Sequence, residues 1–132
     1  MNIQEMSTAC QYRLPVKVFI INNQYMGMVR QWQELLHGGR YSESYTASLP
    51  DFVKLAEAFG ARGLRATKPD EVDAVIKEML AIPGPVIVDV AVDPAENCFP
   101  MIPSGAAHNE MILGPADKQR GGPVSEEGMV LV

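Results

Sequence analysis

The feature that most constrains the fold is an apolar run at residues 16–21, VKVFII, which ends at two adjacent asparagines. Its apolar residues do not alternate cleanly with polar ones, a pattern typical of a parallel-sheet strand covered on both faces. The next stretch, NNQYMGMVRQWQ at 22–33, carries a methionine and the only tryptophan one helical turn apart. We therefore predict a strand at 16–22 and a helix at 26–37, ended by Gly38 and Gly39.

The other elements follow from periodicity and from their start and stop residues. We expect helices at 2–12, 50–60 and from 69 onward, and strands at 61–67 and 85–93. The order helix, strand, helix, helix, strand, helix, strand indicates an α/β three-layer sandwich with a mostly parallel sheet.

Periodicity disappears after residue 93, and Pro and Gly become frequent. We therefore divide the chain into a domain at 1–93 and an extended C-terminal tail at 94–132. The tail is rich in Met, Ile and Phe until residue 113, so we expect that part to lie against an apolar surface. Residues 114–128 are expected to be solvated, with a flexible end.

Charge and cysteine usage exclude several classes of function. The 132 residues carry a formal net charge of −5 without a Lys/Arg run, which argues against a nucleic-acid or anionic-membrane partner. No apolar stretch approaches the roughly 20 residues that span a bilayer. The two cysteines have neither metal-ligand nor disulfide-framework spacing, which favours a reduced, cytoplasmic protein.

The two asparagines stand where ligands collect in an open α/β sheet, at the carboxyl end of a strand. An Asn amide oxygen is a neutral ligand for Mg²⁺, and Gly27 would let a diphosphate approach the start of the following helix. Asn22 and Asn23 are explained equally by a turn and a helix N-cap. A core-facing stripe would likewise account for an apolar set at helical spacing: Met28, Trp32, Leu35 and Leu36.

Two separated stretches resemble the large, catalytic subunit of acetolactate synthase (acetohydroxyacid synthase). They are residues 1–45, MNIQEMSTACQYRLPVKVFIINNQYMGMVRQWQELLHGGRYSESY, and residues 99–112, FPMIPSGAAHNEMI. The resemblance implies the C-terminal domain that binds thiamine diphosphate (thiamine pyrophosphate). In that family the cofactor motif begins with Gly-Asp-Gly and ends with a double Asn, and only the second half is in this sequence. We therefore expect a thiamine diphosphate-binding fold incomplete at the N-terminus, with Met1 an internal methionine of a longer protein, of which this chain is a fragment or a truncated product.

The resemblance also implies roles for individual residues, and none of them is catalytic. Cofactor contacts would come from Asn23, Tyr25, Met26, Gly27 and Met28. The side chain of Asn23 and the main-chain carbonyl of Tyr25 would bind Mg²⁺. A substrate and inhibitor channel would be lined by Met28, Val29, Trp32 and Ser104. The tail around Ser104 would fold over the entrance as an active-site lid, although a passive strap explains its composition as well.

The implied reaction decarboxylates pyruvate and condenses the product with pyruvate or 2-ketobutyrate, in branched-chain amino-acid biosynthesis. Trp32 would form the wall that selects the acceptor. A catalytic Glu from a neighbouring subunit and an FAD on a middle domain belong to the full enzyme, a homodimer or homotetramer for which a regulatory small subunit is a candidate partner. We thus expect the isolated chain to be inactive. The alternatives are a related thiamine diphosphate carboligase or decarboxylase, and a non-catalytic assembly module.

Other polar residues carry no chemistry in this interpretation. His37 and His108 lack a ligand-like neighbour and are expected at the surface or at helix caps. Cys10, on a helical face, is expected to be a small core residue. Asp89 and Asp93 are interpreted as turn residues at the end of the last strand.

Overall fold

The computed structural model describes residues 2–115, which divide into two units. The first unit contains the chain up to Asn23 together with Ala47–Asp93, and the second contains Gln24–Thr46 together with the chain from Pro94 onward. The segment after the first strand thus clusters with the tail. From residue 116 on, the predicted solvated stretch at 114–128 and the predicted flexible end lie outside the described residues.

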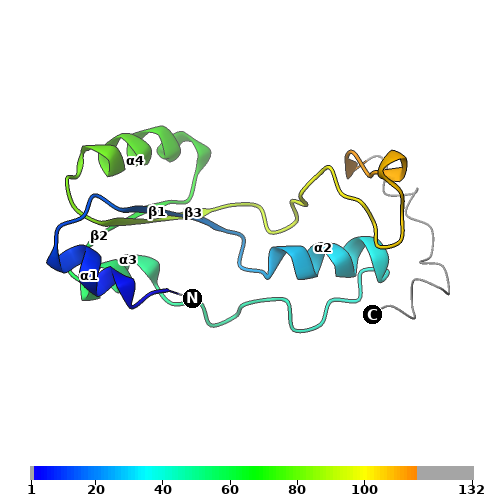
Figure 1. Ribbon diagram of the computed structural model, residues 1–132, viewed down its shortest axis with the longest axis horizontal. Helices are drawn as coiled ribbons and strands as arrows, with labels where there is room; N and C mark the ends of the chain where they lie inside the picture. Colours follow the sequence, from blue (N-terminus) through cyan, green and yellow to red (C-terminus); the bar gives the residue numbers. More distant parts are fainter. Residues whose placement is uncertain (1, 116–132) are drawn as a thin grey trace. The chain divides into compact units, whose positions relative to one another are not determined.

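The first unit is built on a three-stranded parallel sheet. Its strands are β1 (Lys17–Asn22), β2 (Arg62–Ala66) and β3 (Val86–Ala91), in the order β1-β3-β2. Helix α4 (Pro69–Ala81) lies on one face, and helices α1 (Glu5–Gln11) and α3 (Phe52–Ala58) lie on the other (Figure 1). The predicted α/β three-layer sandwich, its parallel sheet and its element order are confirmed.

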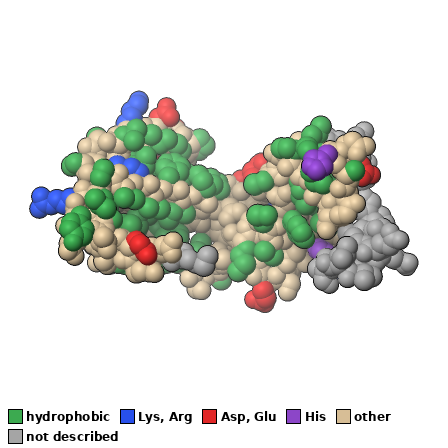
Figure 2. All heavy atoms as spheres, viewed as in Figure 1, with side chains coloured by type: hydrophobic (Ala, Val, Ile, Leu, Met, Phe, Trp, Pro, Cys, Tyr) green, Lys and Arg blue, Asp and Glu red, His purple; other side chains and the backbone are tan. Residues whose placement is uncertain are grey.

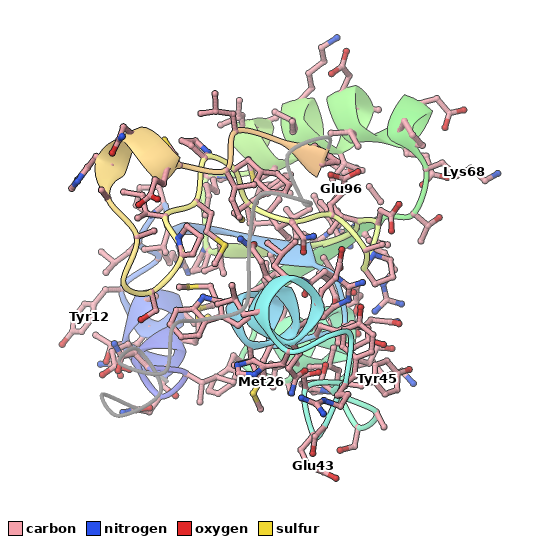
Figure 3. All side chains as sticks on the ribbon, turned by 90° about the vertical axis from the view of Figure 1, so that its right-hand side faces the viewer. Tyr12, Met26, Glu43, Tyr45, Lys68 and Glu96 are labelled. Atoms are coloured by element: carbon pink, nitrogen blue, oxygen red, sulfur yellow. The ribbon has the colours of Figure 1, made fainter. Side chains whose placement is uncertain are left out.

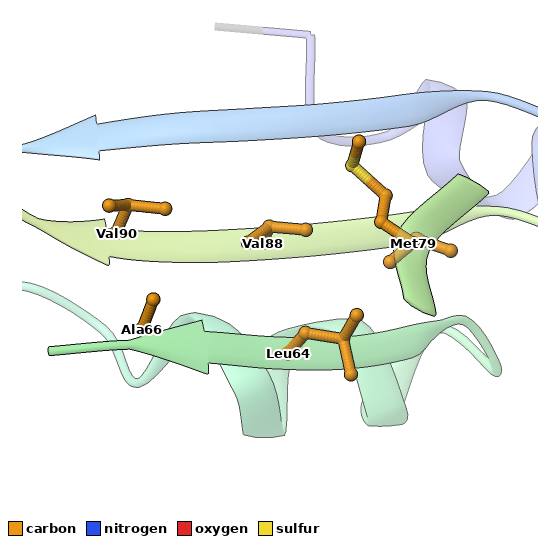
Figure 4. Close-up of a cluster of buried hydrophobic side chains, with 6 residues drawn as sticks. Leu64, Ala66, Met79, Val88 and Val90 are labelled. Atoms are coloured by element: carbon orange, nitrogen blue, oxygen red, sulfur yellow. The ribbon is translucent and has the colours of Figure 1, made fainter. Parts of the chain in front are cut away.

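Strand β3 supplies the core to both faces because successive side chains point to opposite sides of a sheet. Towards α4, its valines join one buried cluster, drawn in Figure 4: Leu64, Ala66, Met79, Val86, Val88 and Val90. Towards α1 and α3, Ile87 joins a second cluster with Met6, Ala56 and Ala61. Cys10 packs against this second cluster, as predicted for a small core residue.

Strand β1 differs from its prediction as a strand covered on both faces. Its residues are only half-buried, and the side chain of Ile21 is 61% exposed. The reason is position: within the described residues β1 pairs with β3 alone, whereas β3 pairs on both sides. The fully covered strand is therefore β3, the clearest strand in the sequence.

Helix starts in this unit follow the capping chemistry. The carboxylate of Asp51 accepts hydrogen bonds from the Val53 and Lys54 amides at the start of α3. Helix α4 has Pro69 at its first turn, and Glu71 accepts from the main-chain amides of Thr67 and Lys68. These bonds satisfy N–H groups that no helical carbonyl reaches.

The second unit contains helix α2 (Gly27–Leu36) and the described part of the tail. The tail holds a short 3₁₀ helix, η1 (His108–Glu110), and an antiparallel bridge between Met101 and Ile112. Ile112 is fully buried, so this apolar part of the tail is packed. Among residues 2–115, no helix has the length and apolarity to cross a bilayer.

Candidate functional site

The carboxyl end of β1 is fixed by two interactions of Asn22. Its main-chain carbonyl accepts from the Val92 amide at 3.1 Å, and its side-chain Nδ2 donates to Asp89 Oδ1 at 2.9 Å. Both contacts join β1 to the neighbouring strand or its continuation. The last residue of β1 is thus held by its backbone and by its side chain.

Asp89 is not the turn residue that was predicted at the end of the last strand. It lies within β3 and is 6% exposed, between Arg65 on β2 and the end of β1. Its second oxygen, Oδ2, accepts from Arg65 Nε at 3.0 Å, and Arg65 also donates to Asp51 Oδ1 at 2.8 Å. The turn interpretation was wrong because a single Asp in an apolar run gives no sign of an Arg on another strand.

This network shifts the pKa of its exposed members. Desolvation is the largest single influence on Arg65 and lowers its pKa, but the hydrogen bonds and charges of Asp89 and Asp51 outweigh it and raise the pKa. Desolvation similarly raises the pKa of Asp51, and bonds from Lys54, Arg65 and Val53 overcome it, so the pKa falls. Arg65 and Asp51 therefore keep their charges at neutral pH.

Asn23 follows directly, half-buried, and Gln24 after it has a φ of 59°. A left-handed residue reverses the chain locally, so Asn23 occupies a turn. The residue at the N-cap of α2 is Met26, not an asparagine. The turn role is thus observed at Asn23 alone, because Asn22 is the last residue of β1, and the predicted N-cap role is observed at neither asparagine.

Residues 24–26 are held by an antiparallel bridge with residues 44–46 in the second unit. The Met26 amide donates to the Ser44 carbonyl at 2.8 Å, and the Thr46 amide donates to the Gln24 carbonyl at 2.9 Å. In such a pair the N–H and C=O of the middle residue, here Tyr25, point away from the partner segment. Figure 3 labels Met26 and Tyr45 on the two sides of this bridge.

Aromatic contacts fix the ring of Tyr25. Its centroid lies 5.1 Å from that of Tyr45, and the Arg30 guanidinium carbon lies 5.5 Å from it and 5.2 Å from the Tyr41 centroid. Such contacts between a cation and aromatic rings are attractive. Tyr25 is thus held by its ring contacts and by the bridge of its backbone with Tyr45.

The start of α2 suits a bound anion. Helix α2 begins at Gly27, its N-cap residue Met26 makes no side-chain cap, and its first turn has no acidic residue. The first amides of a helix have no intrahelical partner and form the positive end of the dipole. A diphosphate therefore fits the chemistry of residues 26–28.

The oxygen donors fit a divalent cation only in part. The Asn23 amide and the Tyr25 carbonyl are hard oxygen ligands of the kind that Mg²⁺ takes together with carboxylates, phosphates and water. Within residues 2–115, no group of three or more His, Cys, Asp or Glu side chains could hold a metal by itself. The remaining ligands must come from the diphosphate, from water and from outside this group of residues.

The exposed side of α2 carries an apolar surface. Met28 is 73% exposed and Trp32 is 41% exposed, so the alternative of a core-facing stripe is wrong for both, whereas Leu35 and Leu36 are half-buried. A hollow of about 490 Å³ is lined by Met28, Val29, Trp32, Gln33, His37 and Arg40. Hydrophobic side chains are visible at the surface of both units in Figure 2.

Three of the four predicted channel residues thus line one hollow: Met28, Val29 and Trp32. The fourth, Ser104, is exposed in a turn closed by the Ala106 amide and the Pro103 carbonyl, and it does not line this hollow. His37 is the exposed C-cap of α2, and His108 is exposed in η1, as predicted for both.

Gln31 holds the tail, a role that no pattern in the sequence predicts. It is 6% exposed, its Nε2 donates to the Cys98 carbonyl at 2.9 Å, and its Oε1 accepts from the Cys98 amide at 2.7 Å. Arg30 adds a contact with Asn97 Oδ1 at 3.4 Å. Because Gln31 takes the buried position on α2, Met28 and Trp32 stay exposed on the helix.

Comparison with known proteins gives a family. Residues 1–90 match the family described as "Thiamine pyrophosphate enzyme, C-terminal TPP binding domain". Among solved structures, the thiamine diphosphate-dependent 4-hydroxybenzoylformate decarboxylase of Rhodococcus jostii RHA1 is similar, with a TM-score of 0.62 and 30% identity. That match covers 69% of this chain and 17% of the other.

Relatives of known name include acetolactate synthase large subunits. The Haemophilus influenzae protein is 48% identical over 114 residues, which are 86% of this chain and 20% of that protein. The isozyme 3 large subunit of Escherichia coli K12 is 47% identical over 121 residues, which are 89% of this chain and 21% of that protein. The chain therefore spans about a fifth of the length of these relatives.

Proposed function

The chain belongs to the thiamine pyrophosphate enzymes, of which it carries the C-terminal TPP-binding domain, and on this premise we propose that it binds thiamine diphosphate and Mg²⁺ as part of an acetolactate synthase large subunit. The observation that carries the proposal is the turn between β1 and α2. Along this segment, Asn22 is anchored at the end of β1, Tyr25 is held by the bridge on either side of it, and α2 begins without a side-chain cap.

In this proposal each residue of the turn has a defined task. The side-chain oxygen of Asn23 and the main-chain carbonyl of Tyr25 bind the metal ion. The backbone of Met26, Gly27 and Met28 lies along the diphosphate, where the helix dipole stabilises negative charge. When bound, the cofactor supplies the decarboxylation and carbon–carbon bond chemistry, and this chain positions it.

The apolar face of α2 would select the acceptor substrate. Met28, Val29 and Trp32 line one exposed hollow, which suits a small 2-keto acid with an alkyl group. One additional methylene in an apolar pocket changes relative binding by about 1 to 3 kcal/mol. We infer that Trp32 favours 2-ketobutyrate over pyruvate in this way, with Ser104 in the segment that closes the channel.

The rest of the assembly belongs to the proposal as well. FAD, a second large subunit as homodimer or homotetramer, and a regulatory subunit would be contributions of the full enzyme in the cytoplasm. The transferase reaction would serve branched-chain amino-acid biosynthesis. We expect the chain alone to be inactive, because the Gly-Asp-Gly half of the cofactor motif is not among its residues and the catalytic Glu would come from a neighbouring subunit.

Cofactor binding is tested by thermal unfolding of the chain with thiamine diphosphate and Mg²⁺. A ligand at 100 times its Kd stabilises the folded state by about 2.7 kcal/mol. For a domain of this size the Tm rises by roughly 10 °C. Asn23→Ala should abolish the Mg²⁺-dependent part of the rise, and Asn109→Ala, an exposed amide in η1, should leave it intact. A Tm that is indifferent to cofactor in the wild type would refute the proposal.

Activity is tested by replacing the matching 121 residues of the Escherichia coli isozyme 3 large subunit with this chain. The hybrid enzyme should form acetolactate from pyruvate. Trp32→Leu in the hybrid should lower the preference for 2-ketobutyrate over pyruvate by roughly tenfold, the equivalent of the loss of one apolar wall. An unchanged product ratio would exclude Trp32 as the selecting residue.

A second candidate, a related decarboxylase, is favoured by the similarity to the Rhodococcus enzyme at 30% identity. A decarboxylase releases an aldehyde instead of joining it to a second 2-keto acid. The same hybrid separates the two, because acetaldehyde without acetolactate would support decarboxylation. A non-catalytic assembly module would instead self-associate on size-exclusion chromatography without any response to cofactor.

A further inference from the structure

The buried carboxylate of Asp89 has no task in the function proposed above. It is 6% exposed in the central strand, on the face that carries the apolar cluster of Ile87 and Ala56. Burying a carboxylate is costly unless its oxygens are paired. An apolar residue at this position would pack in the core without that cost, so we expect the carboxylate to have a role besides packing.

Its two oxygens are divided between the two neighbouring strands. Oδ2 accepts from Arg65 Nε on β2, and Oδ1 accepts from Asn22 Nδ2 at the end of β1. Register explains the reach: Asp89 is paired with Ile20 on β1, and Asn22 is two residues further along the same face. One side chain thus ties the ends of three parallel strands together.

The hydrogen bond from Asn22 to Asp89 holds the residue that directly precedes Asn23, the proposed metal ligand. Strand β1 pairs on one side only within the described residues, so its end has fewer restraints than that of β3. The Val92 amide and the Asp89 carboxylate both hold Asn22 from β3 and its continuation. After Asn23 the chain enters the left-handed Gln24, so the direction of the Asn23 side chain depends on where Asn22 is held.

We propose that Asp89 is a positioning residue: held by Arg65, it fixes the amide of Asn22 and thereby the turn from which Asn23 presents its oxygen to the metal ion of thiamine diphosphate. This inference rests on the proposed function for its ligand. The hydrogen bonds that Asp89 makes with Arg65 and Asn22 do not depend on the proposed function, because all three residues lie in the first unit. Asp51, which caps α3, keeps Arg65 in place from the other side.

The test exchanges the two partners. In Asn22→Asp two carboxylates face each other where an amide donated, so the tie breaks. In Asn22→Asp with Asp89→Asn the donor and acceptor change places, Arg65 still finds an oxygen, and the net charge is that of the wild type. Asp89→Asn alone is the matched control, because both amides can reorient to keep one hydrogen bond.

Two measurements on the full chain test these variants. Hydrogen exchange of the Val92 amide, which bonds the Asn22 carbonyl, reports on the end of β1 without any ligand. Calorimetric titration with thiamine diphosphate at several Mg²⁺ concentrations reports on the metal site. Asn22→Asp should speed Val92 exchange and weaken the Mg²⁺-dependent affinity by about tenfold or more, the usual effect of losing a hydrogen bond to a charged group. The exchanged pair should restore both within threefold.

The outcomes separate the two ideas. Unchanged Val92 exchange in Asn22→Asp, or no recovery in the exchanged pair, overturns the positioning role. Recovery of Val92 exchange without recovery of the Mg²⁺-dependent affinity means that Asn22 acts on the ligand directly, and it also overturns the role. If the variants change the hydrogen exchange of Val92 as expected but the wild type does not bind the cofactor, the proposed function fails, and the role towards the metal ion fails with it.

Discussion

Helix α3 approaches strand β2 closely at Gly63, and replacing this glycine by alanine should destabilise the first unit. A Cβ at Gly63 would lie 2.7 Å from the Val53 Cα, 2.7 Å from the Val53 carbonyl oxygen and 2.9 Å from Val53 Cγ1. Carbon atoms in contact are normally about 3.5 to 4.0 Å apart. Helix α3 would therefore have to move away from β2 by roughly 0.8 to 1.3 Å.

The expected cost is at the upper end of the range for overpacking, about 1 to 3 kcal/mol. Two of the three atoms belong to the Val53 backbone, so no rotamer change relieves the clash. The movement also loosens Ala56, which is fully buried against the second cluster. With a urea m-value of about 2 kcal/mol/M for a domain of this size, the midpoint should fall by roughly 1 to 1.5 M.

The assay is urea unfolding followed by far-ultraviolet circular dichroism, because Trp32 belongs to the second unit and its fluorescence would not report on Gly63. Gly84→Ala is the matched control, since a Cβ there meets no atom within 4 Å. It should be neutral or stabilise the chain by up to about 1 kcal/mol through the unfolded state. If Gly63→Ala unfolds at the same urea concentration as the wild type, the close approach of α3 to β2 is wrong.

Three further predictions concern other parts of the chain. Met79→Ala should lower the free energy of unfolding by about 2 to 5 kcal/mol in the same assay, because it leaves a cavity in the cluster under α4. Hydrogen bonds from Thr67, the largest influence, outweigh desolvation and lower the pKa of Glu71, so its stabilising effect is complete above the ordinary glutamate pKa and is lost as the pH falls through the lowered value. Glu71→Gln should therefore lower the Tm at pH 7, and this difference should disappear on acidification; a constant difference would contradict the assignment. Gln31→Leu leaves the Cys98 amide and carbonyl without their reciprocal partner, so limited proteolysis should cut the tail roughly tenfold faster, while a rate equal to that of the wild type would show that Gln31 does not hold it.

Much of the fold could be predicted from local sequence. Apolar runs marked β1 and β3, and Pro69 and the apolar stripe of residues 72–80 marked α4, because these patterns depend on neighbours within a few residues. The turn around Asn23 was also predictable by its position after a strand. The same reasoning left Asn23 open between a cap and a ligand, since both roles need the same side chain.

What the sequence by itself determined is the order of the elements, the parallel α/β architecture and the family, all of which depend on periodicity and on short contiguous motifs. The tertiary structure alone decided that β3 is the covered strand, that Asp89 is held by Arg65 and Asn22, and that Gln31 takes the buried place on α2 while Trp32 stays exposed. Each of these depends on partners that are far away in the chain. A buried polar side chain is explained only by the group that satisfies it, and no pattern along the sequence names that group.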